Sequence, residues 1–402
     1  MDDAQATRIL TINSGSSSVK FALFQMGGAE TLVLSGRMER IGLAAGVFKA
    51  KGADGAKLVE KAMHLPNHAT AFEALFAWLK DQPDAKNLQA VGHRIVHGGS
   101  KYTQPALIDQ ELIESLKRLV PLAPDHLPHE IEAIEIVGRS NPSLAQVACF
   151  DTAFHANMPR LAKMYALPRE YEAAGVRRYG FHGLSYEYIM GELRSESGAE
   201  TVNGRVVVAH LGNGSSMAAV RQGTCIDTTM GFTPTAGLVM STRTGDLDPG
   251  ILVYLLREKG LTADQVNELV TQRAGLLGVS GTSSDMADLL ESEKHDAAAS
   301  DAVELYCRQA KKFLAAFAGI LGGLDTLIFT AGIGENCPSI RWRICDELGY
   351  LGIRIDPRRN DANARAISAD ESRVRVGVIK TNEELMIARH CFARMRNPSP
   401  TA

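Results

Sequence analysis

The chain has 402 residues, of which 45% are hydrophobic and 22% are charged, which is typical of a soluble globular protein of two domains. The net charge of −3 and the lack of any basic run exclude a sequence-independent grip on nucleic acid, so we expect no nucleic-acid partner. The acidic start, the lack of a bilayer-length apolar stretch and six scattered cysteines without a CxxC pair predict a cytoplasmic protein with no membrane partner, disulfide framework or cysteine zinc site.

The first predicted element is a hairpin over residues 8–24, RILTINSGSSSVKFALF. Apolar runs on both sides of a Gly/Ser turn at residues 13–18 predict two strands. Gly15 lets the backbone approach a ligand, hydroxyls and N–H groups can donate to anionic oxygens, and Lys20 adds a charge. Asn13 offers a neutral oxygen that suits magnesium. The pattern is typical of a phosphate-binding turn, but most Ser/Gly hairpins bind nothing, so both interpretations stay open.

A second stretch repeats this pattern at residues 205–220, RVVVAHLGNGSSMAAV. Gly214-Ser215-Ser216 corresponds to Gly15-Ser16-Ser17. Two such hairpins half a chain apart predict two related halves, which would clasp the phosphates of a nucleotide from both sides. The repeat alone indicates a domain boundary near residue 150.

Several elements between the hairpins carry candidate side chains. Short strands are predicted over residues 31–66, helices over 70–81 and 107–119, and a strand over 145–150. The segment at 90–99 is predicted to start as a strand and end in a loop. Arg94 near the end of one strand is either a surface arginine or a fork for a carboxylate or phosphate. Asp151 follows the other strand, where α/β sheets place functional carboxylates, although it is also a common helix N-cap.

Further candidates lie around and after the second hairpin. His182, in YGFHGLSY, is a structural histidine or a catalyst, and Arg243 lies in a long loop at residues 227–250 whose composition favours function. A capping box at Thr262 and a helix over 302–321 follow. A strand at 326–330 then leads into a glycine turn at 331–336 and a helix after it, which is a nucleotide-site geometry but no Rossmann fingerprint. A last strand at 374–380 precedes Glu383, whose simplest role is to complement a helix dipole.

Taken together, eight motifs resemble the acetokinase family, within the actin, Hsp70 and sugar-kinase superfamily. In chain order they are NSGSSSVK, GHRIVHGG, FDTAFH, RRYGFHG, HLGNGSS, STRTGDLDPG, TAGIGEN and TNEEL. The resemblance implies an α/β fold of two duplicated ribonuclease H-like, actin-like ATPase domains, with mixed sheets flanked by helices and a cleft between them. We expect the domains at residues 1–150 and 151–385, with a C-terminal helix at 386–402 completing the first, and a homodimer.

The same resemblance implies reversible transfer of the ATP γ-phosphoryl group to acetate or another short-chain carboxylate, giving an acyl phosphate and ADP. It assigns Mg²⁺, with Mn²⁺ as the alternative, to Asn13 and Glu383, and catalysis to Arg94, Asp151, His182 and Arg243. The implied nucleotide positions are Lys20, His210, Leu211, Gly212, Asn213, Gly214, Asp285, Met286, Ala287, Gly332, Ile333, Gly334, Glu335 and Asn336. The implied acyl pocket consists of Arg94, Val96, Leu122, Phe181 and Pro234.

The chemistry of this reaction explains those residue types. A carboxylate acceptor is already ionised at neutral pH, so no strong general base is needed. The harder task is to bring two anions together, which arginines, a histidine and a divalent cation accomplish by position and charge. We expect Arg94 to orient the carboxylate, Arg243 and His182 to face the phosphoryl group, and Asp151 to hold the arginines and metal water.

Departures from the family pattern concern substrate and nucleotide. Leu127 replaces a common asparagine, Tyr186 a common histidine and Ala287 an arginine that often lies under the adenine. One methylene is worth only about 1–3 kcal/mol in an apolar pocket, so a propionate or other short-chain acyl kinase stays an alternative. A non-catalytic actin-like ATP switch would have no reason to keep Arg94, His182 and Arg243.

Overall fold

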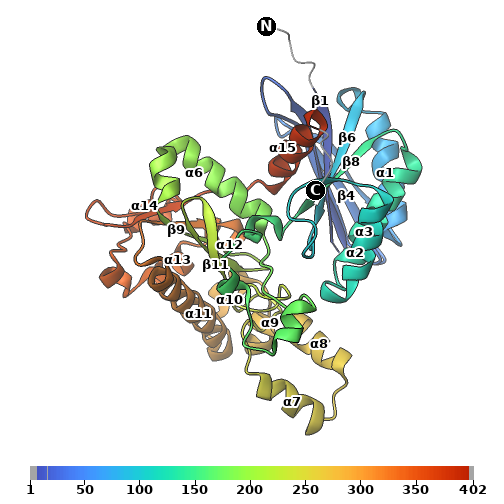
Figure 1. The fold of residues 1–402 in the computed structure, drawn as a ribbon. Coiled ribbons are helices and arrows are strands. Elements are labelled where there is room, and N and C mark those ends of the chain that lie inside the picture. The colour runs from blue at the N-terminus through green and yellow to red at the C-terminus, as the bar shows by residue number, and fades with distance from the viewer. Residues whose placement is uncertain (1–6, 16, 398–402) are drawn as a thin grey trace. The chain divides into compact units, whose positions relative to one another are not determined.

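The computed structural model describes residues 7–15 and 17–397 and divides into two compact units. Unit 1 comprises Met1–Ala153 and Asn382–Ala402, and unit 2 comprises Phe154–Thr381 (Figure 1). Ser16 of the predicted first turn and the last residues of the predicted 386–402 segment lie outside the described residues. Among the described helices, none combines the length and apolarity needed to cross a membrane.

Unit 1 is built on an eight-stranded mixed sheet with the strand order β5-β4-β3-β2-β1-β6-β8-β7. β1 to β5 form an antiparallel meander, and β6 and β8 continue the sheet parallel to β1. The strands are β1 (Thr7–Gly15), β2 (Ser18–Met26), β3 (Thr31–Glu39), β4 (Gly46–Gly52), β5 (Lys57–Met63), β6 (Leu88–Ile95), β7 (Ala106–Leu107) and β8 (Ala145–Phe150).

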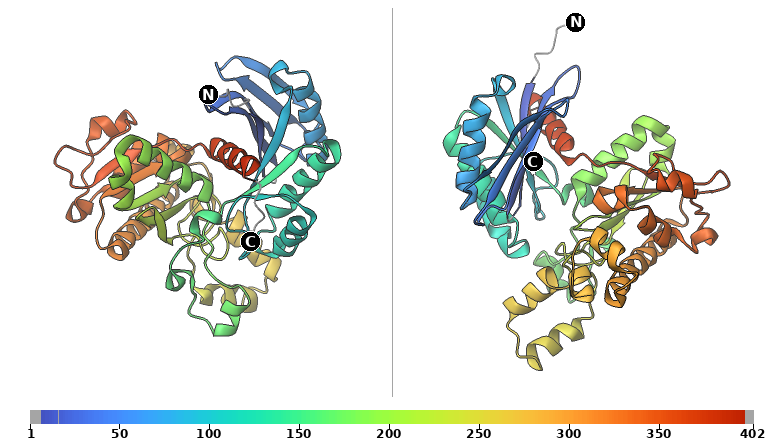
Figure 2. Two further views of the ribbon diagram at one scale, coloured as in Figure 1. Left: turned by 45° about the horizontal axis from the view of Figure 1, so that its top comes forward. Right: turned by 180° about the vertical axis from the view of Figure 1, so that it is seen from behind.

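Helices cover both faces of this sheet. α1 (His68–Lys80), α2 (Gln110–Leu119) and α3 (Leu127–Ser140) lie on one face, and α15 (Glu383–Arg396) lies on the other (Figures 1 and 2). Alternate strand residues such as Leu10 and Ile12 join the core under α1 and α3. On the opposite face, a Cβ at Gly92 would lie only 2.4 Å from Cys391 Sγ of α15, so glycine lets this helix approach the sheet.

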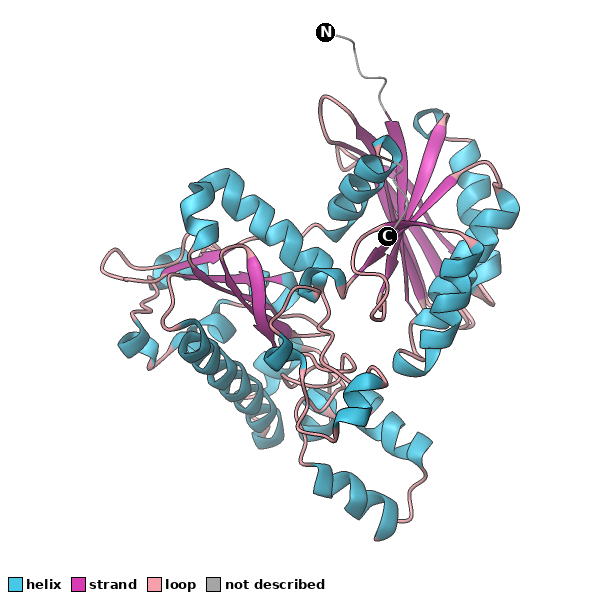
Figure 3. Cartoon of the chain, in the orientation of Figure 1, coloured by secondary structure: helices cyan, strands magenta, loops and turns pink. Residues whose placement is uncertain are grey.

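Unit 2 is built on a five-stranded mixed sheet with the order β11-β10-β9-β12-β13. The strands are β9 (Arg205–His210), β10 (Ser216–Arg221), β11 (Thr224–Thr228), β12 (Thr326–Thr330) and β13 (Arg375–Val378). Its pairing repeats that of β3-β2-β1-β6-β8 in unit 1, because three antiparallel strands are followed by two parallel ones. This repetition confirms the predicted fold of two duplicated mixed sheets flanked by helices (Figure 3).

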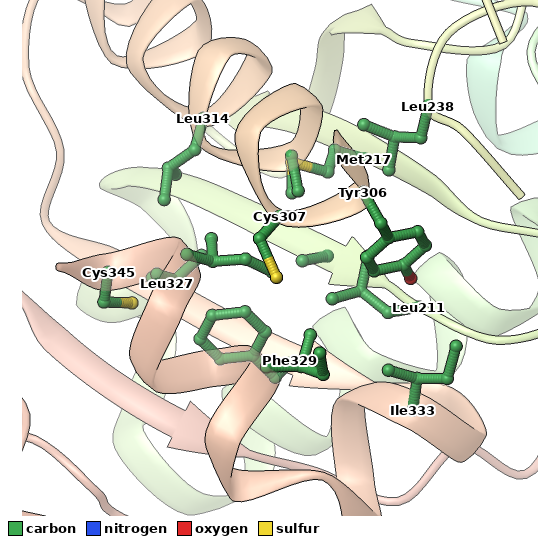
Figure 4. Packing of buried hydrophobic residues seen from close by; sticks show 14 of the residues in the cluster. Leu211, Met217, Leu238, Tyr306, Cys307, Leu314, Leu327, Phe329, Ile333 and Cys345 are labelled. Atoms are coloured by element: carbon green, nitrogen blue, oxygen red, sulfur yellow. The ribbon is translucent and has the colours of Figure 1, made fainter. Parts of the chain in front are cut away.

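The core of unit 2 lies on both faces of its sheet. Val207 and Ala209 of β9 face α11 (Ala297–Leu321), whereas Val206 and Val208 face α6 (Gly183–Asn203). Figure 4 shows Tyr306, Cys307 and Leu314 of α11 packed over strand residues that include Phe329. The remaining helices are α4 (Arg160–Lys163), α5 (Arg169–Ala173), α7 (Pro249–Arg257), α8 (Ala263–Gln272), α9 (Gly275–Ser280), α10 (Met286–Ser292), α12 (Ala331–Asn336), α13 (Pro338–Cys345) and α14 (Pro357–Asp361).

Two local predictions need correction. The first hairpin is tighter than expected, because strand pairing continues through Asn13 with Lys20 and Gly15 with Ser18. Asn13 therefore lies in a strand rather than in a turn. The predicted glycine turn after β12 is already helical, because α12 starts at Ala331, whose φ of 65° reverses the chain directly after the strand.

Candidate active site

Three parallel strands bring the first group of candidate residues together in unit 1. Asn13 lies near the end of β1, Arg94 near the end of β6, and Asp151 directly after β8. Because these strands are neighbours in the sheet, their carboxyl ends meet at one edge. Arg94 donates from Nη2 to Asp151 Oδ2 at 2.5 Å and from Nη1 to Asn13 Oδ1 at 3.1 Å. The first three predicted site residues thus form one hydrogen-bonded group.

This geometry bears on two alternatives that the sequence leaves open. The Arg94 side chain is only 16% exposed and pairs with a carboxylate of the chain itself, so it is not a surface arginine. Asp151 binds that guanidinium and is 1% exposed, so its side chain serves the pair rather than a helix N-cap. Burial opposes the charge of Arg94, but Asp151 and Glu383 outweigh it and raise the pKa of the guanidinium.

Glu383 joins the group from the first turn of α15. Asn382 caps this helix by accepting from the N–H of Leu385, which sets the direction of the first turn. Glu383 Oε2 lies 3.8 Å from Arg94 Nε. Burial raises the pKa of Glu383, Arg94 opposes the shift, and Asp151 and Glu384 add to it. The two carboxylates Asp151 and Glu383 share the single guanidinium, so the charge balance here favours an added cation.

The oxygen atoms of Asn13 and Glu383 fit a hard divalent cation. An amide oxygen and a carboxylate are the ligand types that Mg²⁺ and Mn²⁺ take in proteins. Both side chains face the same guanidinium from separate elements, β1 and α15. The donor chemistry therefore agrees with the predicted metal position.

Lys20 faces an exposed groove on unit 1. It pairs in register with Asn13 across the first hairpin. The groove has a volume of about 610 Å³ and runs over β2 to β5, with Arg37, Lys49 and Lys51 among its lining residues. Lys20 thus contributes positive charge beside Asn13, one of the two predicted metal-binding residues, on a surface that is open to an anion.

His182 is the centre of the second group, in unit 2. It has a left-handed backbone, with φ at 60°, directly before α6. Its Nδ1 lies 2.9 Å from Ser216 Oγ, and its ring stacks on His210 with centroids 4.1 Å apart. Tyr186, the departure from the family histidine, hydrogen-bonds the same Ser216 hydroxyl at 2.5 Å. Tyr186 therefore supports His182 through Ser216.

The second glycine-rich turn lies between His182 and Arg243. A Cβ on Gly214 would lie 3.2 Å from His182 Nε2 and 3.8 Å from Arg243 Nη1. Arg243 also donates to the carbonyl of Pro234 at 3.1 Å. Asn213 holds the arginine loop, because its backbone carbonyl accepts from the Ser241 N–H at 3.2 Å. The fold thus gathers both predicted phosphoryl-binding side chains around the turn.

The other predicted nucleotide segments join this turn by backbone hydrogen bonds. The Leu211 carbonyl accepts from the N–H groups of Ile333 and Gly334 at 2.8 and 3.0 Å. Gly212 is held by the hydroxyl of Ser215, which bonds both its N–H and its carbonyl. Asn336 closes α12 by donating to the Gly332 carbonyl at 2.9 Å. The phosphate turn and α12 therefore form one structure.

Glu335 points into the protein rather than away from it. Its Oε1 accepts from the N–H groups of Ala331 at 2.8 Å and Thr381 at 3.0 Å. The Thr381 hydroxyl in turn bonds Ser185 Oγ, which bonds His210 Nδ1, each at 2.8 Å. Thr381 is the last residue of unit 2 before the chain enters unit 1. Both predicted nucleotide segments are thus linked by hydrogen bonds to that crossing point.

The remaining predicted residues are divided between several places. Asp285 caps α10 by accepting from the Ala287 N–H at 2.7 Å, and Met286 is buried in the core of unit 2. Of the predicted acyl pocket, Val96 and Leu122 belong to unit 1, whereas Phe181 and Pro234 belong to unit 2.

Leu127, one of the departures from the family pattern, is fully buried at the start of α3. Two structural supports were missed by the sequence analysis. Glu130 of α3 accepts from the Val96 N–H at 3.0 Å, and burial raises its pKa to about 8. Arg341 is fully buried and donates to the Gly334 carbonyl at 2.9 Å, as well as to Asn360. Glu130 and Arg341 stand in ordinary helical patterns, so no local signal distinguishes them from surface charges.

Comparison with known proteins places this geometry in a family. The model of the acetokinase family matches residues 8–389. An acetate kinase of Rhodopseudomonas palustris is 46% identical over 395 residues, covering 96% of this chain and 97% of its own. The crystal structure of Porphyromonas gingivalis acetate kinase has 37% identity and a TM-score of 0.88, covering 97% of this chain and all (100%) of that one. A propionate kinase from Francisella tularensis has 37% identity and a TM-score of 0.90, covering 96% of this chain and 98% of that one. The chain belongs to the acetokinase family.

Proposed function

We propose that this protein is an acetate kinase, which transfers the γ-phosphoryl group of ATP to acetate and forms acetyl phosphate and ADP. A carboxylate oxygen of acetate forms the new bond to phosphorus, and the bond to the β,γ-bridging oxygen breaks, its electron pair remaining on ADP. The main support, besides membership of the family, is the buried Arg94 group with Asn13, Asp151 and Glu383.

In unit 1, Arg94 orients the acceptor. Asp151 occupies the Nε and Nη2 edge of the guanidinium, and Asn13 accepts from Nη1. An incoming carboxylate is therefore expected to replace Asn13 as the hydrogen-bond acceptor of Nη1, while Asp151 keeps the guanidinium fixed. Because Asp151 is already engaged with Arg94, we assign it a positioning role and not that of a general base.

In unit 2, Arg243 and His182 neutralise charge on the transferring phosphoryl group. Both side chains flank Gly214, and glycine-rich turns of this kind can bind phosphate oxygens through backbone N–H groups. Lys20 adds charge from unit 1, and α12 with Asp285 and Ala287 lies on the adenosine side. In related phosphoryl transfers a single arginine contributes roughly 10³- to 10⁵-fold in rate.

Asn13 and Glu383 would hold Mg²⁺, or Mn²⁺ in its place. When bound, the ion supplies positive charge that neutralises phosphate oxygens.

A hydroxamate assay tests the activity and its acyl preference. Purified protein with Mg-ATP is given acetate, propionate or butyrate, and kcat/KM is compared between them. We expect the highest value for acetate. A higher value for propionate would favour the activity named for the Francisella relative, whereas no acyl phosphate from any acid, despite ATP binding, would refute the proposal.

We further propose a cytoplasmic homodimer. All six cysteines are free, which suits a reducing compartment. α7 buries none of its residues and exposes Ile251, Val253, Tyr254 and Leu256, an apolar surface that a second copy would cover. Light scattering after gel filtration is expected to give twice the chain mass of 43.4 kDa. A concentration-independent monomer would contradict the dimer.

A further inference from the structure

Three metal-ligating side chains lie together in unit 1, apart from the residues assigned to the reaction. They are His68, His129 and Glu132, whose ligand atoms all lie within 4.8 Å of one another. His129 and Glu132 are three residues apart on α3, so they share one face of that helix. His68 is the first residue of α1, which packs against α3. Two helices therefore contribute two imidazoles and one carboxylate to one place.

The orientation of His68 is fixed by the first glycine-rich turn. Its Nε2 lies 2.8 Å from the carbonyl oxygen of Gly15. A carbonyl can only accept, so Nε2 carries the proton and Nδ1 keeps the lone pair. Histidines that bind metals usually donate their other ring N–H to a carbonyl or carboxylate in this way. His68 thus already makes the supporting hydrogen bond that a metal ligand requires.

The second imidazole lies beside the first. The rings of His68 and His129 are stacked, with centroids 4.6 Å apart and planes inclined by 25°. His68 is buried, whereas His129 and Glu132 are half-buried. One ligand is therefore rigid, and the two on α3 have room to turn.

We propose that His68, His129 and Glu132 bind one divalent transition-metal ion of the zinc class. Two nitrogens and one carboxylate oxygen form a typical three-ligand set for Zn²⁺, with a fourth position for water. Magnesium avoids imidazole and prefers oxygen ligands, so this site is chemically distinct from Asn13 and Glu383. Ligand atoms in a tetrahedral zinc site lie about 3.3 Å apart, and a metal lies in the plane of each imidazole that binds it. Binding therefore requires His129 to rotate out of its stack on His68 and Glu132 to turn inwards.

A bound ion would act on the first turn as well as on the helices. It would join α1 to α3 and strengthen the hydrogen bond from His68 to the Gly15 carbonyl, because a metal on one imidazole nitrogen makes the N–H on the other more acidic. Zinc is therefore expected to raise the thermal stability of the protein without nucleotide. The inference does not rest on the proposed function.

The test uses the full chain, stripped of metal by a chelator, with Zn²⁺ alone and no nucleotide or magnesium. Calorimetric titration is expected to show one tightly bound ion per chain, which a large excess of Mg²⁺ does not displace. Removing a supporting hydrogen bond alone costs about 10- to 100-fold in metal affinity, so His129→Gln and Glu132→Gln should each cost at least about 100-fold. Co²⁺ should give the visible absorption of a four-coordinate site in the unaltered protein and not in the variants.

Two matched controls share the residue types but not the cluster. His295→Gln removes an exposed histidine of unit 2. Glu135→Gln removes a glutamate that lies three residues after Glu132 on α3 and pairs with Lys117. Both should retain the affinity of the unaltered protein. Equal zinc affinity in Glu132→Gln, His129→Gln and the controls, displacement of zinc by Mg²⁺, or no stoichiometric binding would each overturn the proposal. Circular dichroism shows whether each variant is folded. If His129→Gln does not fold, the zinc affinity of Glu132→Gln, which keeps both imidazoles, tests the proposal.

Discussion

Arg94 holds Asp151 through three contacts, from Nη2 to Oδ2 at 2.5 Å and from Nε to Oδ1 and Oδ2 at 3.2 and 3.1 Å. The pair comes from neighbouring strands, β6 and β8, whose register places Arg94 opposite Cys149, two residues before Asp151. A bidentate contact of this kind fixes both the position and the rotation of a guanidinium. The side chain that we propose to bind the acceptor is therefore oriented before any ligand arrives.

The substitution Asp151→Asn tests this orientation. It keeps the shape of the side chain but removes its charge, so Arg94 gains rotational freedom. We expect kcat/KM for acetate to fall by about 10- to 100-fold, as for other groups that orient a functional side chain. In the variant Arg94→Ala, kcat/KM for acetate should fall by about 10³-fold or more.

Asp325→Asn is the matched control for Asp151→Asn. Asp325 also binds an arginine, Arg205, through two oxygens, but its side chain is 43% exposed and lies outside the candidate site. Steady-state kinetics should find it within about twofold of the unaltered protein, as expected for a surface pair. Normal turnover by Asp151→Asn together with inactive Arg94→Ala would contradict the positioning role.

Arg341→Met tests how α12 is anchored. The buried guanidinium donates to Gly334, Asn360 and Asn363, and its loss leaves buried oxygens without donors. Each such oxygen costs about 1–3 kcal/mol, so we expect a large fall in melting temperature and a raised KM for ATP.

Arg343→Met, two residues further on α13, provides the comparison for Arg341→Met. Arg343 is 28% exposed and binds the carboxylates of Glu293, which is 15% exposed, and of Glu304, which is 64% exposed. Its loss leaves fewer buried oxygens without a donor than the loss of Arg341, so it should lower the melting temperature less and leave the KM for ATP unchanged. Similar melting temperatures for the two variants would show that Arg341 is not the anchor.

Thr381→Val tests the fastening of the nucleotide segments to the chain crossing. The change keeps the side-chain shape but removes the hydroxyl that bonds Ser185, the partner of His210. One hydrogen bond contributes about 1 kcal/mol to stability, so we expect the melting temperature to fall by a few degrees and the KM for ATP to rise. Thr201→Val removes a hydroxyl bonded within α6, so it should lower the melting temperature by a similar amount and leave the KM for ATP unchanged. An unaltered KM for ATP in Thr381→Val would contradict the inference that the hydrogen bonds at Thr381 support the nucleotide segments.

His155 makes stability depend on pH. Burial lowers its pKa to about 4, against the opposing hydrogen bond to the Phe181 carbonyl. The unfolded chain, with a histidine pKa near 6.5, therefore binds more protons than the folded one between about pH 4 and 6.5. The contribution of His155 to stability is complete above this window and falls by about 1.4 kcal/mol for each pH unit between 6.5 and 4.

The substitution His155→Asn should reduce the slope of the free energy of unfolding against pH by the amount that one proton contributes. His93 has the same lowered pKa, for the same reason, and keeps its own share of the slope. Chemical unfolding at pH 5 to 8 measures the slope, and the exposed His295→Asn serves as the control. An identical slope in His155→Asn and the unaltered protein would contradict a neutral buried histidine.

The sequence by itself determined the elements whose signals are local. The two glycine-rich hairpins, the strands β8 and β12, the capping box at Thr262 and the order of motifs are all readable from neighbouring residues. The repeat of the hairpins predicted the duplicated fold, because strand periodicity and turn chemistry act within a few residues of the chain.

Only the tertiary structure decided what the charged side chains do. Arg94 and Asp151 are 57 positions apart, Glu335 and Thr381 are 46 apart, and no pattern within either segment reveals the partner. Glu130 and Arg341 look like surface charges in the sequence but are buried, because their partners come from other elements. No local pattern relates His68 to His129, which meet only because α1 packs against α3. Burial and charge pairing depend on contacts between distant segments, so the fold has to form before these roles exist.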